Sequence, residues 1–71
     1  MTIYSRSTCG PCQSLKKYLV HKGVEFIEKS VDDENNLKEM LALTGVQIVP
    51  TAVKGDKYVI GLNYSAINAI I

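Results

Sequence analysis

The sequence predicts an α/β domain in which a mixed four-stranded sheet packs against three helices. Short apolar runs of strand length alternate with runs of helical period, in the order β-α-β-α-β-β-α. The first strand–helix–strand unit favours parallel pairing, because parallel strands need a crossover connection. The dipeptide Gly55-Asp56 is typical of a tight hairpin turn, so the last two strands are expected to pair antiparallel.

Length and composition indicate one small domain without a marked charge. The 71 residues suffice for a single core, and residues 1–71 are expected to form one domain around it. A formal net charge of +1 gives no reason to expect a nucleic-acid or membrane partner. No run approaches the roughly twenty apolar residues of a membrane span, and the N-terminus lacks a signal-peptide pattern. We therefore expect a cytoplasmic protein, and we take it to be a monomer.

The first half of the chain predicts two strands separated by a helix. Thr2 to Ser5 is short, β-rich and apolar, as a buried strand requires. A helix is expected from Gln13 to His21, with Gly23 as its stop. Val24 to Lys29 is the second strand candidate. The side chains of the helix from Gln13 to His21 that are expected to face the core are Leu15, Leu19 and Val20.

The middle of the chain predicts a second helix with recognisable ends. Asp32 or Asp33 can cap its N-terminus, because a short acidic side chain accepts a hydrogen bond from a free backbone N–H. Gly45 suits the position just after the helix. The residues expected to line one face of it are Leu37, Met40, Leu41 and Thr44.

The last third of the chain predicts a hairpin followed by a short helix. Thr51 to Lys54 and Lys57 to Ile60 are the two strands, on either side of the glycine-containing turn. Asn63 can cap the helix that follows. The apolar residues expected on one side of this helix are Ile67, Ile70 and Ile71.

Both cysteines lie in Thr8-Cys9-Gly10-Pro11-Cys12, between the first strand and the first helix. Two thiols at this spacing and position suit reversible disulfide chemistry. Cys9 stands at the helix start, where free N–H groups and the macrodipole favour thiolate, so we predict that it is the nucleophile. Cys12, one turn further on, is the predicted resolving cysteine. We expect Cys9 to be exposed and Cys12 to be largely covered.

Metal binding by the cysteines is the main alternative, and no metal site is predicted within one chain. A structural zinc ion takes four ligands, and the only other good candidate is His21. His21 follows Cys12 by nine residues, on the opposite helix face and about 13 Å further along the axis. Two chains could still share a zinc ion or an iron–sulfur cluster. Lys16 and Lys17 are interpreted as solvated charges on the exposed side of the helix, and Tyr64 as packing.

Three segments resemble the glutaredoxins, the small members of the thioredoxin superfamily. Tyr4 to Cys12 is similar to their active-site stretch. Thr44-Gly45 followed by Val49-Pro50 resembles their Thr-Val-Pro region, and Ile60-Gly61-Leu62 resembles the turn before their last helix. The resemblance covers nearly the whole chain. It implies a minimal thioredoxin fold and a dithiol-disulfide oxidoreductase that cycles a Cys9–Cys12 disulfide in cell redox homeostasis.

The resemblance also implies roles for the residues around the cysteines. Val49 and Pro50 are expected to form a groove, where a cis proline leaves the Val49 backbone free to pair with an extended substrate or with glutathione. The structural alternative is that Pro50 is only a proline at the start of an edge strand. The residues that complete the implied groove are Gly61, Leu62 and Asn63. The residues that would support the cysteines are Arg6, Thr8, Gly10 and Pro11, although a lone arginine is usually a solvated loop charge.

Departures from the glutaredoxin pattern bear on the electron donor. The Gly10-Pro11 dipeptide is the thioredoxin choice, and Asn63-Tyr64-Ser65 stands where glutathione-binding members usually place paired aspartates. Both features favour the redoxins that are reduced by thioredoxin reductase with NADPH and donate electrons to ribonucleotide reductase. A glutathione-dependent glutaredoxin is the alternative. No bound cofactor is expected in either case. A peptide-binding adaptor without redox turnover is a third class, which nothing in the sequence favours.

Overall fold

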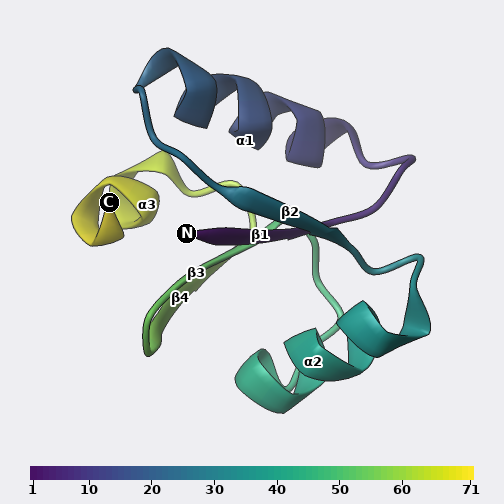
Figure 1. Cartoon of the computed structure of the whole chain (residues 1–71). Helices are drawn as coiled ribbons and strands as arrows, with labels where there is room; N and C mark the ends of the chain where they lie inside the picture. The colour runs from purple at the N-terminus through teal and green to yellow at the C-terminus, as the bar shows by residue number, and fades with distance from the viewer.

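The computed structural model describes all 71 residues and has the predicted order of elements. The sheet has the strand order β2-β1-β3-β4, in which β1 is parallel to β2 and antiparallel to β3, and β4 is antiparallel to β3. Helices α1 and α3 cover one face of the sheet and α2 covers the other (Figure 1). This confirms the predicted α/β class. The elements are β1 (Thr2–Ser5), α1 (Gly10–His21), β2 (Ile27–Ser30), α2 (Glu34–Thr44), β3 (Thr51–Lys54), β4 (Lys57–Ile60) and α3 (Tyr64–Ile70).

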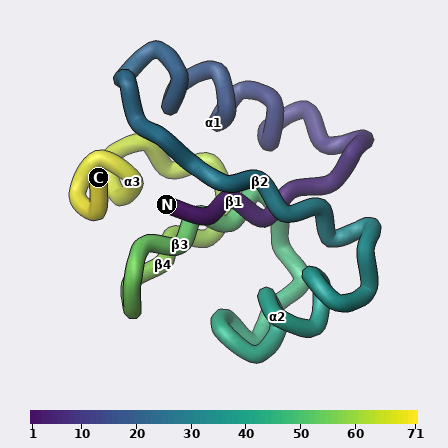
Figure 2. The backbone as a smooth tube through the Cα atoms, in the orientation of Figure 1, coloured from purple at the N-terminus to yellow at the C-terminus, as the bar shows by residue number.

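Strand β1 supplies both halves of the core, because successive side chains of a strand point to opposite faces. Ile3 packs on the α1 and α3 side and Tyr4 on the α2 side, and both are fully buried. The tube in Figure 2 shows β1 running through the middle of the molecule between the two helical layers. The other core residues beside Ile3 are Leu15, Leu19, Ala52, Val59 and Ile67, and those beside Tyr4 are Val31 and Met40.

The helix ends follow the predicted capping residues. Asp33, rather than Asp32, caps α2 and accepts the Asn35 N–H at 2.9 Å. Gly45 ends α2 in the left-handed conformation, with a φ of 75°, and its N–H donates to the Leu41 carbonyl. Asn63 caps α3 by accepting the Ala66 N–H at 3.1 Å. Each side chain satisfies a backbone donor that the helix leaves without a partner.

Three expectations about the first helix and the second strand are wrong. Val20 is 69% exposed, because it lies about 100° around the helix from the buried Leu19. Strand β2 begins at Ile27 instead of Val24. The Val24 N–H is already bound to the carbonyl of Leu19 at the end of α1, and the Ile27 N–H is bound to Met1 at the start of the ladder. Helix α1 also begins at Gly10, three residues before its predicted start.

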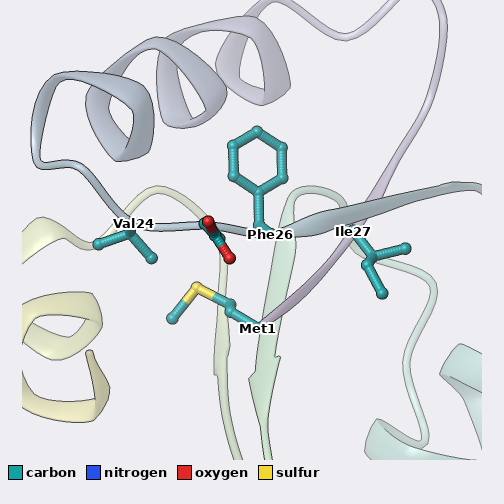
Figure 3. Close-up of a pocket in the computed structure, with 5 residues that line it drawn as sticks. Met1, Val24, Phe26 and Ile27 are labelled. Atoms are coloured by element: carbon teal, nitrogen blue, oxygen red, sulfur yellow. The ribbon is translucent and has the colours of Figure 1, made fainter.

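The largest hollow in the surface lies at the N-terminal ends of β1 and β2, away from the cysteines. It has a volume of about 520 Å³. Figure 3 shows the Phe26 ring turned toward α1, with Met1 and Val24 beside the segment that precedes β2, and all three pack against the same core. Ile27 at its edge is 65% exposed.

No helix is long and apolar enough to cross a bilayer.

A polar network fastens α2 to the sheet. The buried Tyr4 hydroxyl donates a hydrogen bond to Glu39 of α2, and Lys29 of β2 forms an ion pair with the same carboxylate at 2.6 Å. Burial and the hydrogen bond to Glu39 raise the pKa of Tyr4 to about 12. The hydrogen bonds from Lys29 and Tyr4 lower the pKa of Glu39. Three elements that are separate in the sequence therefore meet at one carboxylate.

Replacing the tyrosine hydroxyl in this network should destabilise the fold. We expect Tyr4→Phe to lower the free energy of unfolding by about 1–2 kcal/mol, because it removes a hydrogen bond to a charged group. Urea denaturation at pH 7 measures the change. Tyr58→Phe is the matched control, since Tyr58 is 44% exposed and forms no hydrogen bond through its hydroxyl. Equal losses in the two variants would show that the Glu39 contact contributes nothing specific.

The effect of Tyr4→Phe should also depend on pH. The pKa of Glu39 is lower in the folded protein than in the unfolded chain. Its contribution is therefore present above the unfolded pKa and is lost as the pH falls through the folded pKa. We expect the stability difference between Tyr4→Phe and the parent protein to narrow in acid. A difference that stays constant from pH 7 to well below the usual glutamate pKa would contradict this.

Candidate active site

The loop between β1 and α1 is held at both ends before it reaches the first cysteine. The Cys9 N–H donates to the Arg6 carbonyl at 3.2 Å, which closes the loop on itself. The Ser7 N–H donates to the Asp32 carboxylate at 3.2 Å, which ties the loop to the segment after β2. Hydrogen bonds from Ser7 are the main cause of the lowered pKa of Asp32. The loop therefore presents Cys9 in a defined position at the helix start.

The two cysteines occupy different environments on α1. Cys9 is the N-cap residue, and its sulfur accepts the Cys12 backbone N–H at 3.2 Å. Cys9 is partly exposed, whereas Cys12 is fully buried against the sheet. The two form a disulfide, and their Cα atoms are 5.3 Å apart. Of the two cysteines, only Cys9 is therefore accessible to a second molecule.

The geometry at Cys9 favours the negatively charged form of its sulfur once the disulfide is open. A backbone N–H that already points at the sulfur stabilises a thiolate more than a thiol. The helix macrodipole acts in the same direction, because its positive end lies at this residue. The arrangement can therefore form, exchange and re-form a disulfide at one exposed sulfur.

The segment before β3 lies against the exposed sulfur. The Val49 carbonyl oxygen is 4.0 Å from Cys9 Sγ, and the Val49–Pro50 peptide bond is cis. Pro50 is buried, and its carbonyl accepts the Gly61 N–H at 2.8 Å. Gly61 adopts a φ of 83°, a conformation that residues with a side chain rarely adopt. The structure therefore brings the partly exposed Val49 against Cys9 to form one surface, while Pro50 is buried and holds Gly61 through its carbonyl.

Apolar side chains flank this surface on two sides. Leu62, which the resemblance implicated, is 39% exposed, and Asn63 beside it uses its side chain to cap α3. Ile48 is 48% exposed directly before the Val49–Pro50 segment, and sequence reasoning missed it. Its position next to Val-Pro was the only available signal. Exposed apolar side chains thus adjoin the Val49–Pro50 segment and Gly61.

The residues predicted to support the cysteines make few side-chain contacts. Arg6, Thr8, Gly10 and Pro11 are all exposed. Arg6 acts on Cys9 through its backbone carbonyl, while its guanidinium forms no ion pair within the chain. A Cβ atom at Gly10 would meet nothing within 4 Å, so the surroundings of this residue are open. Pro11 stands in the first turn of α1, where its missing N–H costs nothing.

A polar hollow of about 290 Å³ lies behind the loop, between α1 and β2. Lys16 was expected to be solvated, but its side chain is only 21% exposed and pairs with Glu28 at 2.6 Å. The Ser5 hydroxyl donates to the same Glu28 oxygen at 2.7 Å. The hydrogen bonds from Lys16 and Ser5 lower the pKa of Glu28. The residues that line the hollow are Ser5, Arg6, Ser7, Gln13, Lys16, Glu28 and Ser30.

The remaining candidates lie away from the cysteines. His21 is exposed at the far end of α1, and no group of three or more His, Cys, Asp or Glu side chains could hold a metal ion. Tyr64 stacks on Tyr18 of α1 with a centroid distance of 4.3 Å, which agrees with its interpretation as packing. Lys17 is exposed, as expected.

Comparison with known proteins places these observations in a family. Residues 1–59 match the Glutaredoxin family. An uncharacterized glutaredoxin-like protein from the rubredoxin operon of Clostridium pasteurianum is 33% identical over 97% of this chain and 93% of its own length. The glutaredoxin-like protein NrdH of Escherichia coli is 29% identical over 99% of this chain and 86% of its own length.

Solved structures agree with the sequence comparison. A glutaredoxin from Archaeoglobus fulgidus superposes with a TM-score of 0.87 at 29% identity, over 97% of this chain and 82% of that one. The NrdH-redoxin of Escherichia coli superposes with a TM-score of 0.83 at 28% identity, over 99% and 92% of the two chains. The four-stranded sheet and its three helices are those of the thioredoxin fold.

Proposed function

The chain belongs to the glutaredoxin family, and on that premise we propose that it is a small dithiol-disulfide oxidoreductase that reduces protein disulfides through Cys9 and Cys12. The observation that carries the proposal is the pairing of a partly exposed sulfur, which caps α1, with a fully buried one. This asymmetry supports the two roles that we propose. Cys9 meets the substrate, and Cys12 acts only within the chain.

The reaction transfers two electrons in two exchanges. The Cys9 thiolate attacks a substrate disulfide, so a Cys9–substrate bond forms and one substrate sulfur leaves as a thiolate. Cys12 then loses its proton and attacks Cys9 Sγ, which releases the second substrate sulfur. The substrate disulfide is reduced to two thiols, while Cys9 and Cys12 are oxidised to a disulfide. An external reductase restores the dithiol.

The surface beside Cys9 supports a protein as the substrate. The backbone N–H and carbonyl of Val49 form no hydrogen bond to another backbone group. They can pair with an extended peptide that approaches the Cys9 sulfur 4.0 Å away. The exposed Ile48 and Leu62 would contact apolar side chains on either side of the substrate cysteine. We expect the protein to act in the cytoplasm as a monomer, without a nucleic-acid or membrane partner.

Thioredoxin reductase with NADPH is the electron donor that we propose, and ribonucleotide reductase is the proposed substrate. Asn63-Tyr64-Ser65 supplies no carboxylate at the start of α3, where glutathione-binding members usually place paired aspartates. The related NrdH-redoxin of Escherichia coli is described as having a thioredoxin-like activity profile. Both points favour thioredoxin reductase over glutathione for this chain.

Two coupled assays on the same protein test the donor. NADPH consumption is followed with a disulfide substrate, first with thioredoxin reductase and then with glutathione plus glutathione reductase. We expect turnover with thioredoxin reductase and little with glutathione. Turnover only in the glutathione system would show that the missing carboxylates do not matter. Intact thiols with no turnover in either system would contradict the proposed activity as a whole.

Separate substitutions of the cysteines test their roles. We expect Cys9→Ser to reduce turnover to background, because Cys12, the one remaining thiol, is fully buried. We expect Cys12→Ser to accumulate a mixed disulfide at Cys9, since the resolving thiol is gone. Mass spectrometry of the non-reduced protein detects that adduct. An adduct on Cys12 in the Cys9→Ser protein would reverse the assignment.

A single added carboxylate should move the donor preference. Asp caps helices as well as Asn does, so Asn63→Asp keeps α3 while it adds a negative charge beside the groove. We expect the activity with glutathione to rise about twofold to fivefold, the range that an exposed ion pair supports. Ala69→Asp, at an exposed position near the far end of α3, is the control for charge alone. An equal rise in both variants would contradict a specific contact at residue 63.

A further inference from the structure

The ion pair nearest to the buried cysteine takes no part in the two disulfide exchanges. Lys16 follows Cys12 by four residues on α1, and residues at this spacing are neighbours on a helix surface, with about 5–6 Å between Cβ atoms. Cys12 is fully buried, and the Lys16 side chain is only 21% exposed. Both side chains therefore face the sheet, and Lys16 lies one helical turn after Cys12 along α1.

The partner of Lys16 is held in place by the central strand. One oxygen of Glu28 is 2.6 Å from Lys16 Nζ and 2.7 Å from the Ser5 hydroxyl. Ser5 is 2% exposed at the end of β1, just before the loop that carries Cys9. Three elements, α1, β1 and β2, thus meet at one carboxylate on the same face of the sheet as Cys12.

Few other charges lie near Cys12 from the elements that pack around it. Lys16 comes from α1 and Glu28 from β2, and both line the polar hollow with the exposed Arg6. Asp32 lies beyond Arg6 and is bound to the Ser7 backbone. Lys17 and His21 are exposed elsewhere on α1. In the reduced protein the nearest charge to Cys12 is the Cys9 thiolate, whose sulfur accepts the Cys12 N–H, and the Lys16–Glu28 pair is the next charged group on this face of the sheet.

We propose that the Lys16–Glu28 ion pair is a positioning element that sets the protonation of the Cys12 thiol and with it the rate of the resolving step. The inference rests on the proposed dithiol chemistry. While Glu28 is ionised it cancels the charge of Lys16, so that Cys12 stays a thiol until a substrate is bound to Cys9. The pair lines a polar hollow that is open to solvent, and water there is the acceptor that we assign to the departing proton, although Cys12 itself does not line the hollow.

The proton and electrons balance in this step. The Cys12 thiol loses its proton toward the hollow, and its sulfur forms a bond to Cys9 Sγ. The bond between Cys9 and the substrate sulfur breaks, and the substrate leaves as a thiolate that takes up a proton. An unpaired ammonium at residue 16 favours the Cys12 thiolate, whereas an unpaired carboxylate at residue 28 disfavours it.

The test is an NMR titration of the reduced protein with ¹³Cβ-labelled cysteine, in which Cys12 is assigned by comparison with Cys9→Ser. We expect Glu28→Gln to lower the pH at which Cys12 titrates, and Lys16→Met to raise it. Each shift should be about one pH unit, as for a unit charge roughly 10 Å away at an effective dielectric constant of about 20–30. The double variant should return close to the parent value, because both charges are gone.

The protein contains a matched control on the other face of the sheet. Lys29 and Glu39 form a pair with the same 2.6 Å separation, and their side chains are 34% and 43% exposed. Glu39→Gln and Lys29→Met should leave the Cys12 titration almost unchanged. The pH profile of mixed-disulfide resolution should shift with the titration in the Lys16 and Glu28 variants. A purely structural role would lower stability without moving either profile.

The outcomes separate this inference from the proposed function. The titration needs neither substrate nor reductase, so it can be read even if no turnover is found. Opposite shifts in Glu28→Gln and Lys16→Met support the inference. Shifts in the same direction, or shifts no larger than those of the control pair, overturn it while leaving the dithiol activity intact. If one variant fails to fold, the sign of the shift in the other decides.

Discussion

The hydrogen bond from the Cys12 N–H to the Cys9 sulfur is the contact on which the active site depends. It satisfies one of the free donors at the start of α1, as an N-cap side chain does, and it also places the partial positive charge of an N–H group next to the sulfur that reacts. Helix initiation and thiolate stabilisation are therefore one interaction. This is why α1 begins at Gly10 and not at the first residue of its apolar stripe. Any residue that replaced Cys9 would have to preserve the cap as well as the chemistry.

The sheet topology determines what lies opposite that sulfur. Because β1 and β3 are antiparallel, with Tyr4 paired to Thr51, the end of β1 meets the beginning of β3. The loop that leaves β1 carries Cys9, and Pro50 immediately precedes β3. The hydrogen bond from Gly61 to Pro50 then adds the end of β4 to the same edge. Three segments that are far apart in the sequence are thus brought to one sulfur by strand order alone.

Local patterns in the sequence were enough to predict these elements, but not the contacts between them. Asn63, Gly45 and the Gly55-Asp56 turn act through their immediate neighbours, so their roles could be inferred from sequence. The start of β2 could not be inferred from the sequence. The Val24 N–H is bound to the Leu19 carbonyl near the end of α1, and the apolar character of Val24 does not reveal this contact. The environment of the Lys16 side chain was predicted wrongly for a related reason. Its charge suggested solvent, whereas its spacing from Cys12 already placed it on the inner face of the helix.

The two ion pairs of the sheet show how one geometry can serve two purposes. Lys29–Glu39 and Lys16–Glu28 have the same separation, and each carboxylate also accepts a hydrogen bond from a buried hydroxyl of β1. Exposed pairs of this kind contribute little to stability, so stability alone does not account for a charged pair at either position. On the α2 face the carboxylate satisfies Tyr4, whose hydroxyl would otherwise be buried without a partner. On the α1 face the carboxylate likewise satisfies the buried hydroxyl of Ser5, and in addition it balances the charge of Lys16 one helical turn from Cys12, which is the role that we propose for it.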